Sequence, residues 1–149
     1  MKSKIWIIGL IVFLNFGCSN KSSNNNKVNG TWQLVWVEAN ISGNITRENL
    51  EGKKMIKIIN DTHFAFLNHD LKSGKDSAAL FVAGGGTCKL TDSIYSEFLE
   101  YCNYREWEGL KVDFKVQFNH DTLILSGQEV KEDIKVDQFI TEKYVKIGG

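Results

Sequence analysis

The chain has 149 residues, with 18 basic and 18 acidic side chains and a formal net charge of zero. That length suits one domain with a substantial core rather than two domains. The balanced charge lacks the basic footprint of a nucleic-acid-binding protein. The sequence contains no proline, so every residue of a strand can donate a ladder hydrogen bond.

Residues 1–17 have the pattern of a secretory signal peptide. Lys2 and Lys4 precede the largely apolar residues 5–16, a stretch of signal-peptide length that is too short to span a bilayer. Gly17-Cys18 then resembles a bacterial lipobox, whose thiol is acylated before cleavage leaves the cysteine as the first residue. We therefore expect a signal peptide over 1–17 and a lipid anchor on Cys18. An ordinary cleaved signal and an uncleaved anchor are the alternatives.

Residues 18–29 continue as a polar segment of low complexity, rich in Ser, Asn and Lys. Such a segment buries too little apolar surface to offset the entropy of ordering it. We expect the lipidated cysteine and a flexible linker here, followed by one folded domain over residues 30–149.

Apolar and polar residues alternate after residue 30, which is typical of half-buried β-strands. The predicted strands are 31–38, 54–59, 63–68, 78–83, 87–91, 94–102, 110–118, 122–126 and 139–147. Short turns between neighbours favour an antiparallel up-and-down barrel, which closes to protect its edges. The predicted fold class is therefore all-β, a barrel of about eight or nine strands. On the first strand, Trp32, Leu34 and Trp36 are expected to share a face.

The strongest hairpin pattern covers residues 110–126. If His120-Asp121 is the turn, Phe118 faces Leu123 and Val116 faces Leu125, so that one apolar face continues across both strands.

A second hairpin is predicted around Asn60-Asp61-Thr62. A three-residue loop there aligns Ile58 with Phe64 and Ile56 with Phe66.

The cysteine positions argue against a disulfide. With a turn at Asp92-Ser93, Cys88 faces Glu97 on the next strand, and Cys102 lies five residues further along with the opposite parity. That places the thiols about 16 Å apart at about 3.3 Å per residue, well beyond disulfide reach. We expect two free thiols unless the glycine run 84–86, which suggests a bulge, bends the strand sharply.

Three longer connections remain. Residues 39–53 contain a possible helical turn at 46–50, residues 103–109 place Tyr104 and Trp107 in a loop, and residues 128–138 are charged and expected to be solvated.

Gly30-Thr31-Trp32 resembles the Gly-X-Trp signature of the lipocalin and fatty-acid-binding superfamily. More of the chain is similar to small lipocalin-like lipoproteins of Gram-negative bacteria, whose function is mostly unassigned. The similar stretches are 30–35, 55–59, 63–66, 83–87, 95–101 and 142–144. The resemblance implies a barrel with a central cavity, anchored in the cell envelope at the outer membrane, and supplies no ligand or catalytic site. Tyr144 and Cys88 stand where relatives often have Trp and Tyr.

Glu97 is the most informative polar residue of the predicted barrel. It shares a strand face with Tyr95, Leu99 and Tyr101. If that face lines the barrel, its buried carboxyl group needs a partner or must become neutral, and Glu142 is a similar candidate on the last strand. The alternative is that Glu97 faces solvent.

Trp32, Phe64 and Phe66 could form an aromatic pocket, since core and pocket wall coincide in a small barrel. The predicted ligand-binding residues are Trp32, Phe64, Phe66, Tyr95, Glu97 and Tyr144. A small, mostly apolar or amphipathic ligand would have its polar head against Glu97.

No catalytic, cofactor or metal site is predicted, because the histidines lack metal-ligand spacing and no nucleophile motif occurs. We expect a non-enzymatic envelope lipoprotein that binds such a ligand, attached to the membrane by its anchor. The alternative is a packed barrel that serves as a protein-interaction module.

Overall fold

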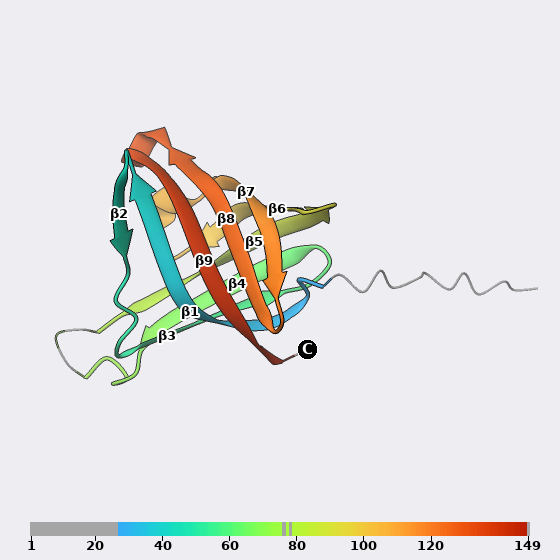
Figure 1. The fold of residues 1–149 in the computed structure, drawn as a ribbon. Helices are drawn as coiled ribbons and strands as arrows, with labels where there is room; N and C mark the ends of the chain where they lie inside the picture. Colours follow the sequence, from blue (N-terminus) through green and yellow to red (C-terminus); the bar gives the residue numbers. More distant parts are fainter. Residues whose placement is uncertain (1–26, 76, 78, 149) are drawn as a thin grey trace, which may run out of the picture.

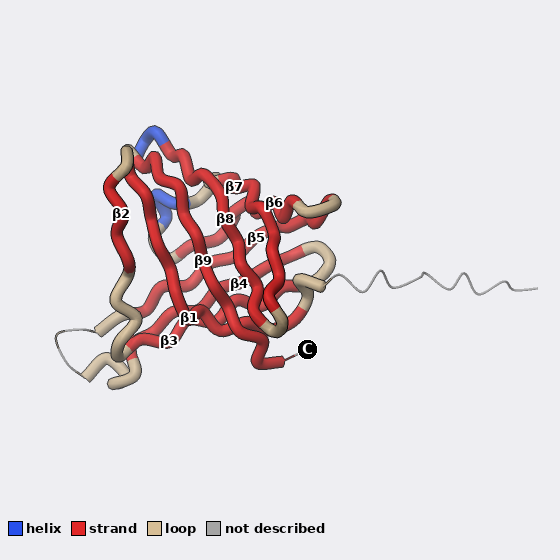
Figure 2. Tube along the Cα trace, in the orientation of Figure 1, coloured by secondary structure: helices blue, strands red, loops and turns tan. Residues whose placement is uncertain are grey.

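The computed structural model describes residues 27–75, 77 and 79–148. The predicted signal peptide, Cys18 and most of the linker lie outside these residues. The described chain is almost entirely β-strand (Figure 2). Its strands are β1 (Gly30–Ile41), β2 (Asn44–Arg47), β3 (Lys53–Ile59), β4 (His63–Asp70), β5 (Phe81–Thr91), β6 (Ile94–Cys102), β7 (Lys111–Asn119), β8 (Thr122–Lys131) and β9 (Val136–Gly148), and its two short 3-10 helices are η1 (Arg105–Trp107) and η2 (Glu132–Ile134). None of the described helices is long and apolar enough to cross a bilayer.

The sheet closes because the last strand returns to the first. Strands β3 to β9 each pair antiparallel with the next, and β9 pairs with β1 along nearly the whole length of both. On its other edge, β1 pairs with β3 through residues 30–33 and with β2 through residues 38–41. The described chain thus forms a closed eight-stranded barrel with β2 as one added strand (Figure 1), which confirms the predicted all-β fold.

The hairpin of β7 and β8 has the predicted register. Phe118 lies opposite Leu123, and Val116 lies opposite Leu125. Both leucines are completely buried, because every second side chain of these strands points into the barrel.

The register of β3 and β4 differs from the prediction by one residue. Phe66 lies opposite Lys57 rather than Ile56, and the other predicted pair is displaced in the same way. The amide of Asn60 donates to the carbonyl of His63 at 3.0 Å, which closes a two-residue turn instead of a three-residue one. A one-residue shift exchanges the faces of a strand, so Lys57 points into the barrel.

Strand β1 contains a bulge that corrects the predicted position of Trp36. Leu34 pairs with Tyr144 and Trp36 with the preceding residue of β9, so Val35 is the extra residue. Trp32 and Leu34 point inward as predicted. After the bulge the parity changes, so Val37 is buried and Trp36 is not.

A second bulge, in β6, corrects the positions of Tyr101 and Cys102. Gly86 pairs with Leu99 but Gly85 pairs with Tyr101, so Glu100 is the extra residue. Tyr101 is 69% exposed, whereas Cys102 is buried. The predicted register at the turn end of this hairpin is confirmed, but parity counting across the bulge placed both side chains on the wrong face.

The glycine run belongs to one continuous strand, β5, and does not separate two strands as predicted. A Cβ atom at Gly84 would lie 2.7 Å from Cζ of Phe66. At Gly86 it would overlap the carbonyl oxygen of Phe98. The bare backbone therefore makes room for the Phe66 ring inside the barrel and allows the close approach of β6 at its bulge.

Two of the predicted connections contain strand residues, and the third, 103–109, contains η1. Residues 44–47 form β2 against the end of β1 instead of the expected helical turn at 46–50. In the charged segment 128–138, β8 continues to Lys131 and β9 begins at Val136. Cross-strand pairing overrides the local polar composition at both places.

One end of the barrel is filled by side chains. Trp32 is 2% exposed, and its indole Nε1 donates to the carbonyl oxygen of Val28 at 2.7 Å. Its ring lies 6.3 Å from that of Phe118, and Tyr144 is completely buried deeper in the barrel. Space inside the barrel therefore lies toward the other end, and the pocket that Trp32 and Phe118 line with Lys146 opens at the outside of the filled end.

Candidate functional site

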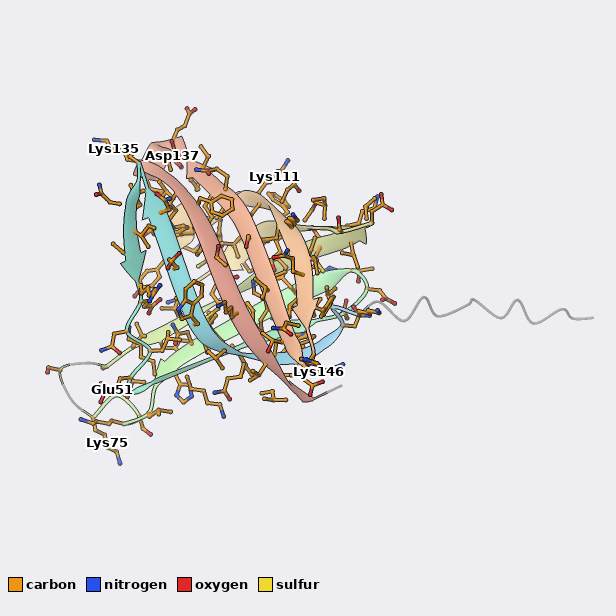
Figure 3. The ribbon with its side chains drawn as sticks, in the orientation of Figure 1. Glu51, Lys75, Lys111, Lys135, Asp137 and Lys146 are labelled. Carbon is orange, nitrogen blue, oxygen red and sulfur yellow. The ribbon has the colours of Figure 1, made fainter. Side chains whose placement is uncertain are left out.

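The barrel encloses a cavity of about 410 Å³, within the range of small-molecule sites. Its apolar walls include Phe64 and Phe66 of β4, Leu99 of β6 and Phe114 of β7, and Trp107 of η1 lies at its rim. Since the start of β9 also contributes, the cavity extends toward the barrel end where Figure 3 labels Lys135 and Asp137, opposite Lys146.

Lys57 lies at the deep end of the cavity, bonded to two carboxylates from opposite parts of the sheet. Its Nζ is 3.0 Å from Oε1 and 3.3 Å from Oε2 of Glu97 on β6. It is also 3.4 Å from Oε2 of Glu142 on β9. The exposed fractions of these three side chains are only 4%, 10% and 12%. Burial of Glu97 confirms that its strand face points inward.

Three aromatic rings complete the surroundings of the ammonium group. Nζ of Lys57 lies 5.8 Å from the ring centroid of Phe64, 5.5 Å from that of Phe114 and 5.4 Å from that of Tyr144. These distances are within the range of cation–π attraction. The charge is therefore stabilised by carboxylates and by ring faces, which accounts for a lysine inside a small barrel.

The titration of this cluster reflects burial and charge together. Burial disfavours the ammonium of Lys57, but the carboxylates of Glu142 and Glu97 outweigh it and hold the Lys57 pKa well above its usual range. For Glu97 burial dominates and raises the pKa, although Lys57 partly opposes the shift. One ammonium thus does not fully compensate the carboxyl groups around it.

Nearer the rim, Glu129 of β8 forms a second polar pair. Its Oε2 accepts a hydrogen bond from Nε2 of Gln138 on β9 at 2.6 Å, and both residues line the cavity. Burial raises the pKa of Glu129, and the negative charges of Glu142 and Glu97 add to the shift while Lys57 opposes it. Glu129 is therefore electrostatically coupled to the deep cluster.

The predicted site residues divide into two groups. Phe64, Phe66 and Glu97 line the cavity as predicted. Tyr95 and Tyr144 are buried beside the cluster, and the pKa of each hydroxyl is raised by burial and then by a neighbouring carboxylate. These two tyrosines do not contribute to the cavity wall, and neither does Trp32, the sixth predicted residue, which lies at the filled end of the barrel.

Lys57, Glu129 and Gln138 are among the polar residues of the cavity that sequence reasoning missed. Apolar residues occupy both faces of the strand around Lys57, so the pattern does not show which face is buried. Glu129 and Gln138 occur in a charged segment that was expected to be exposed to solvent. Trp107 was predicted only as a loop aromatic, although it packs against the core. The sequence did contain a signal for Glu129. It lies an even number of residues from Leu123 and Leu125 on the same strand, so it shares their inward face.

The described residues contain no group of three or more His, Cys, Asp or Glu side chains placed to hold a metal ion. Cys88 and Cys102 are free thiols. Cys88 lies opposite Glu97 as predicted, and its pKa is raised by burial first, which leaves it poorly reactive at neutral pH.

Stability is expected to fall as pH rises above the ordinary carboxyl range, because the pKa values of Glu97 and Glu129 are raised in the native state. The native protein then binds more protons than the unfolded chain, so this stabilisation is complete below the unfolded pKa of 4.5 and is lost as pH passes the native value. Glu129→Gln should flatten the decline, measured as urea-unfolding free energies at several pH values. Glu51→Gln is the exposed control, and parallel curves for wild type and Glu129→Gln would contradict the interpretation.

The chain matches no protein-family model, and neither a curated protein nor a solved structure matches it. The geometry of the cavity therefore carries the functional argument.

Proposed function

We propose that this chain is a lipid-anchored protein of the Gram-negative cell envelope whose barrel binds a small, mostly apolar ligand with a polar head. Cys18 would hold the anchor, and residues up to 29 would tether the barrel. The role is binding rather than catalysis, with Phe64, Phe66 and Glu97 as contacts.

The observation that carries this proposal is the cavity itself. A barrel of eight strands can be filled by side chains or can hold one small ligand. Here one end is packed around Trp32, while about 410 Å³ remains open beyond the Lys57 cluster. Apolar walls with a few convergent polar groups are the usual composition of a ligand site. The mutual pairing of Lys57 with Glu97 and Glu142 supports a binding role, because it holds the lysine as an ammonium rather than as a free amine nucleophile.

The test is native mass spectrometry of the full chain, produced in a Gram-negative host and extracted in mild detergent. We expect a reproducible added mass that is lost in Val82→Trp, which fills the cavity, and retained in Ile58→Trp, which adds the same ring to the outer face. The anchor is tested by separating the extract into a detergent phase and an aqueous phase. The lipid-anchored protein should remain in the detergent phase, and the Cys18→Ser variant should move to the aqueous phase. An added mass that survives Val82→Trp would refute binding in the cavity.

A clean, unliganded mass would favour the second candidate, a protein-interaction module. One surface feature supports it: Leu67 is 40%, Phe81 60% and Tyr101 69% exposed. They lie on the outer face of the adjacent strands β4, β5 and β6, where a partner could cover them.

A further inference from the structure

The cavity contains more carboxyl groups than basic groups. Glu97, Glu129 and Glu142 line it together with a single cation, Lys57. A fourth carboxylate at the rim, Glu48, is already paired with the Lys53 ammonium at 2.9 Å. Lys57 neutralises one carboxylate at most, so the interior retains an excess of negative charge whenever the three deeper groups are ionised.

Two acceptor atoms of the cavity are buried and unmatched by a hydrogen-bond donor of the described residues, although the hydroxyls of Tyr95 and Tyr144 beside the cluster are unmatched as well. Oδ1 of Asn68 lines the cavity, is buried and accepts no hydrogen bond from the described residues. Oε1 of Glu97 is likewise buried and outside hydrogen-bonding geometry, although its ion-pair contact with Lys57 is 3.0 Å. Unmatched buried acceptors carry a desolvation cost that an incoming N–H donor would remove.

The walls suit a cation as well as an apolar body. Phe64 and Phe114 already face the ammonium of Lys57 at 5.8 and 5.5 Å, and Phe66, Tyr104 and Trp107 line the space above it. Aromatic faces beside carboxylates attract ammonium groups.

We propose that the ligand is an amphipathic amine, with an apolar body between the aromatic walls and a protonated head that donates to Glu129 and the unmatched acceptors. This inference rests on the proposed function, since it names the ligand class of the same cavity. An anionic head would compete with Glu97 and Glu142 for an ammonium that both already contact.

The raised pKa values of Glu97 and Glu129 agree with this assignment. Burial is the main cause of both shifts, and the repulsion from Glu142 that adds to them is the part that a bound ammonium would relieve.

The experiment uses three probes that share one apolar body: octylamine, octanol and octanoate. Each is titrated at neutral pH into the full-length protein in nanodiscs, followed by calorimetry with empty discs as the blank. We expect octylamine to bind at least about tenfold more tightly than octanol, and octanoate to bind most weakly, because a charged hydrogen bond adds selectivity of that order.

Two variants locate the effect. Glu129→Gln should weaken octylamine binding about tenfold and leave octanol unchanged. Glu51→Gln makes the same charge change on an exposed turn, outside the barrel wall (Figure 3), and should alter neither. Equal or tighter binding of octanol or octanoate would overturn the amine assignment while leaving a ligand-binding barrel. Failure of all three probes, with no copurified mass, would overturn both.

Discussion

Lys57→Met is expected to lower the free energy of unfolding at neutral pH by about 3–5 kcal/mol, the usual cost of breaking a buried ion pair by removing one partner. Methionine keeps most of the apolar stem but leaves the carboxyl groups of Glu97 and Glu142 buried without their ammonium. The measurement is urea unfolding followed by tryptophan fluorescence. Lys54→Met, on the exposed face of the same strand, should change stability by no more than about 0.5 kcal/mol.

The loss should depend on pH and should be reversible by further substitution. Without Lys57 the native carboxyl groups hold protons more strongly, so the variant should lose more stability as pH rises. Replacing Glu97 and Glu142 by Gln in the same chain should recover most of the loss, because the unpaired charges are gone. If Lys57→Met were as stable as Lys54→Met, the charge cluster would contribute nothing to the fold.

Gly86→Ala is the second large expected effect, a loss of at least about 3 kcal/mol or failure to fold. The new Cβ atom would overlap the carbonyl oxygen of Phe98 and lie 2.8 Å from the amide nitrogen of Glu100. Both are backbone atoms of β6, so no side-chain rotation can relieve the contact, and β5 and β6 must separate at the bulge. Circular dichroism and the urea midpoint measure the loss.

Gly148→Ala is the matched control, because the nearest atom to its added Cβ lies 3.7 Å away in ordinary van der Waals contact. Its unfolding midpoint should remain close to that of the wild type. The same midpoint for Gly86→Ala would show that the strands can adjust without the glycine.

The sequence predicts the fold well because strand patterning is local. Alternation along residues 110–126 determined both the hairpin and its register, and the same logic placed Glu97 opposite Cys88. It failed wherever one extra residue changes the parity. No characteristic residue type marks the bulges at Val35 and Glu100 in the sequence. The outward orientation of Trp36 and Tyr101 therefore could not be predicted.

The candidate site was less predictable than the fold. Apolar residues occupy both faces of β3, so the pattern does not show whether Lys57 points into the barrel or outward. The turn between β3 and β4, which is one residue shorter than predicted, sets the register that points it inward. Glu129 looked solvated because its sequence neighbours are charged. Its burial depends on the pairing of β8 with β9, which brings Gln138 within hydrogen-bonding distance.

By itself, the sequence determined an all-β fold and the position of Glu97 opposite Cys88, because both follow from alternation along single strands and short turns. Only the tertiary structure decided what surrounds that carboxyl group. The open cavity and its excess of acidic groups arise from side chains of β3, β4, β6, β8 and β9 that meet across the barrel. Such meetings depend on register, bulges and closure, which are properties of the whole sheet.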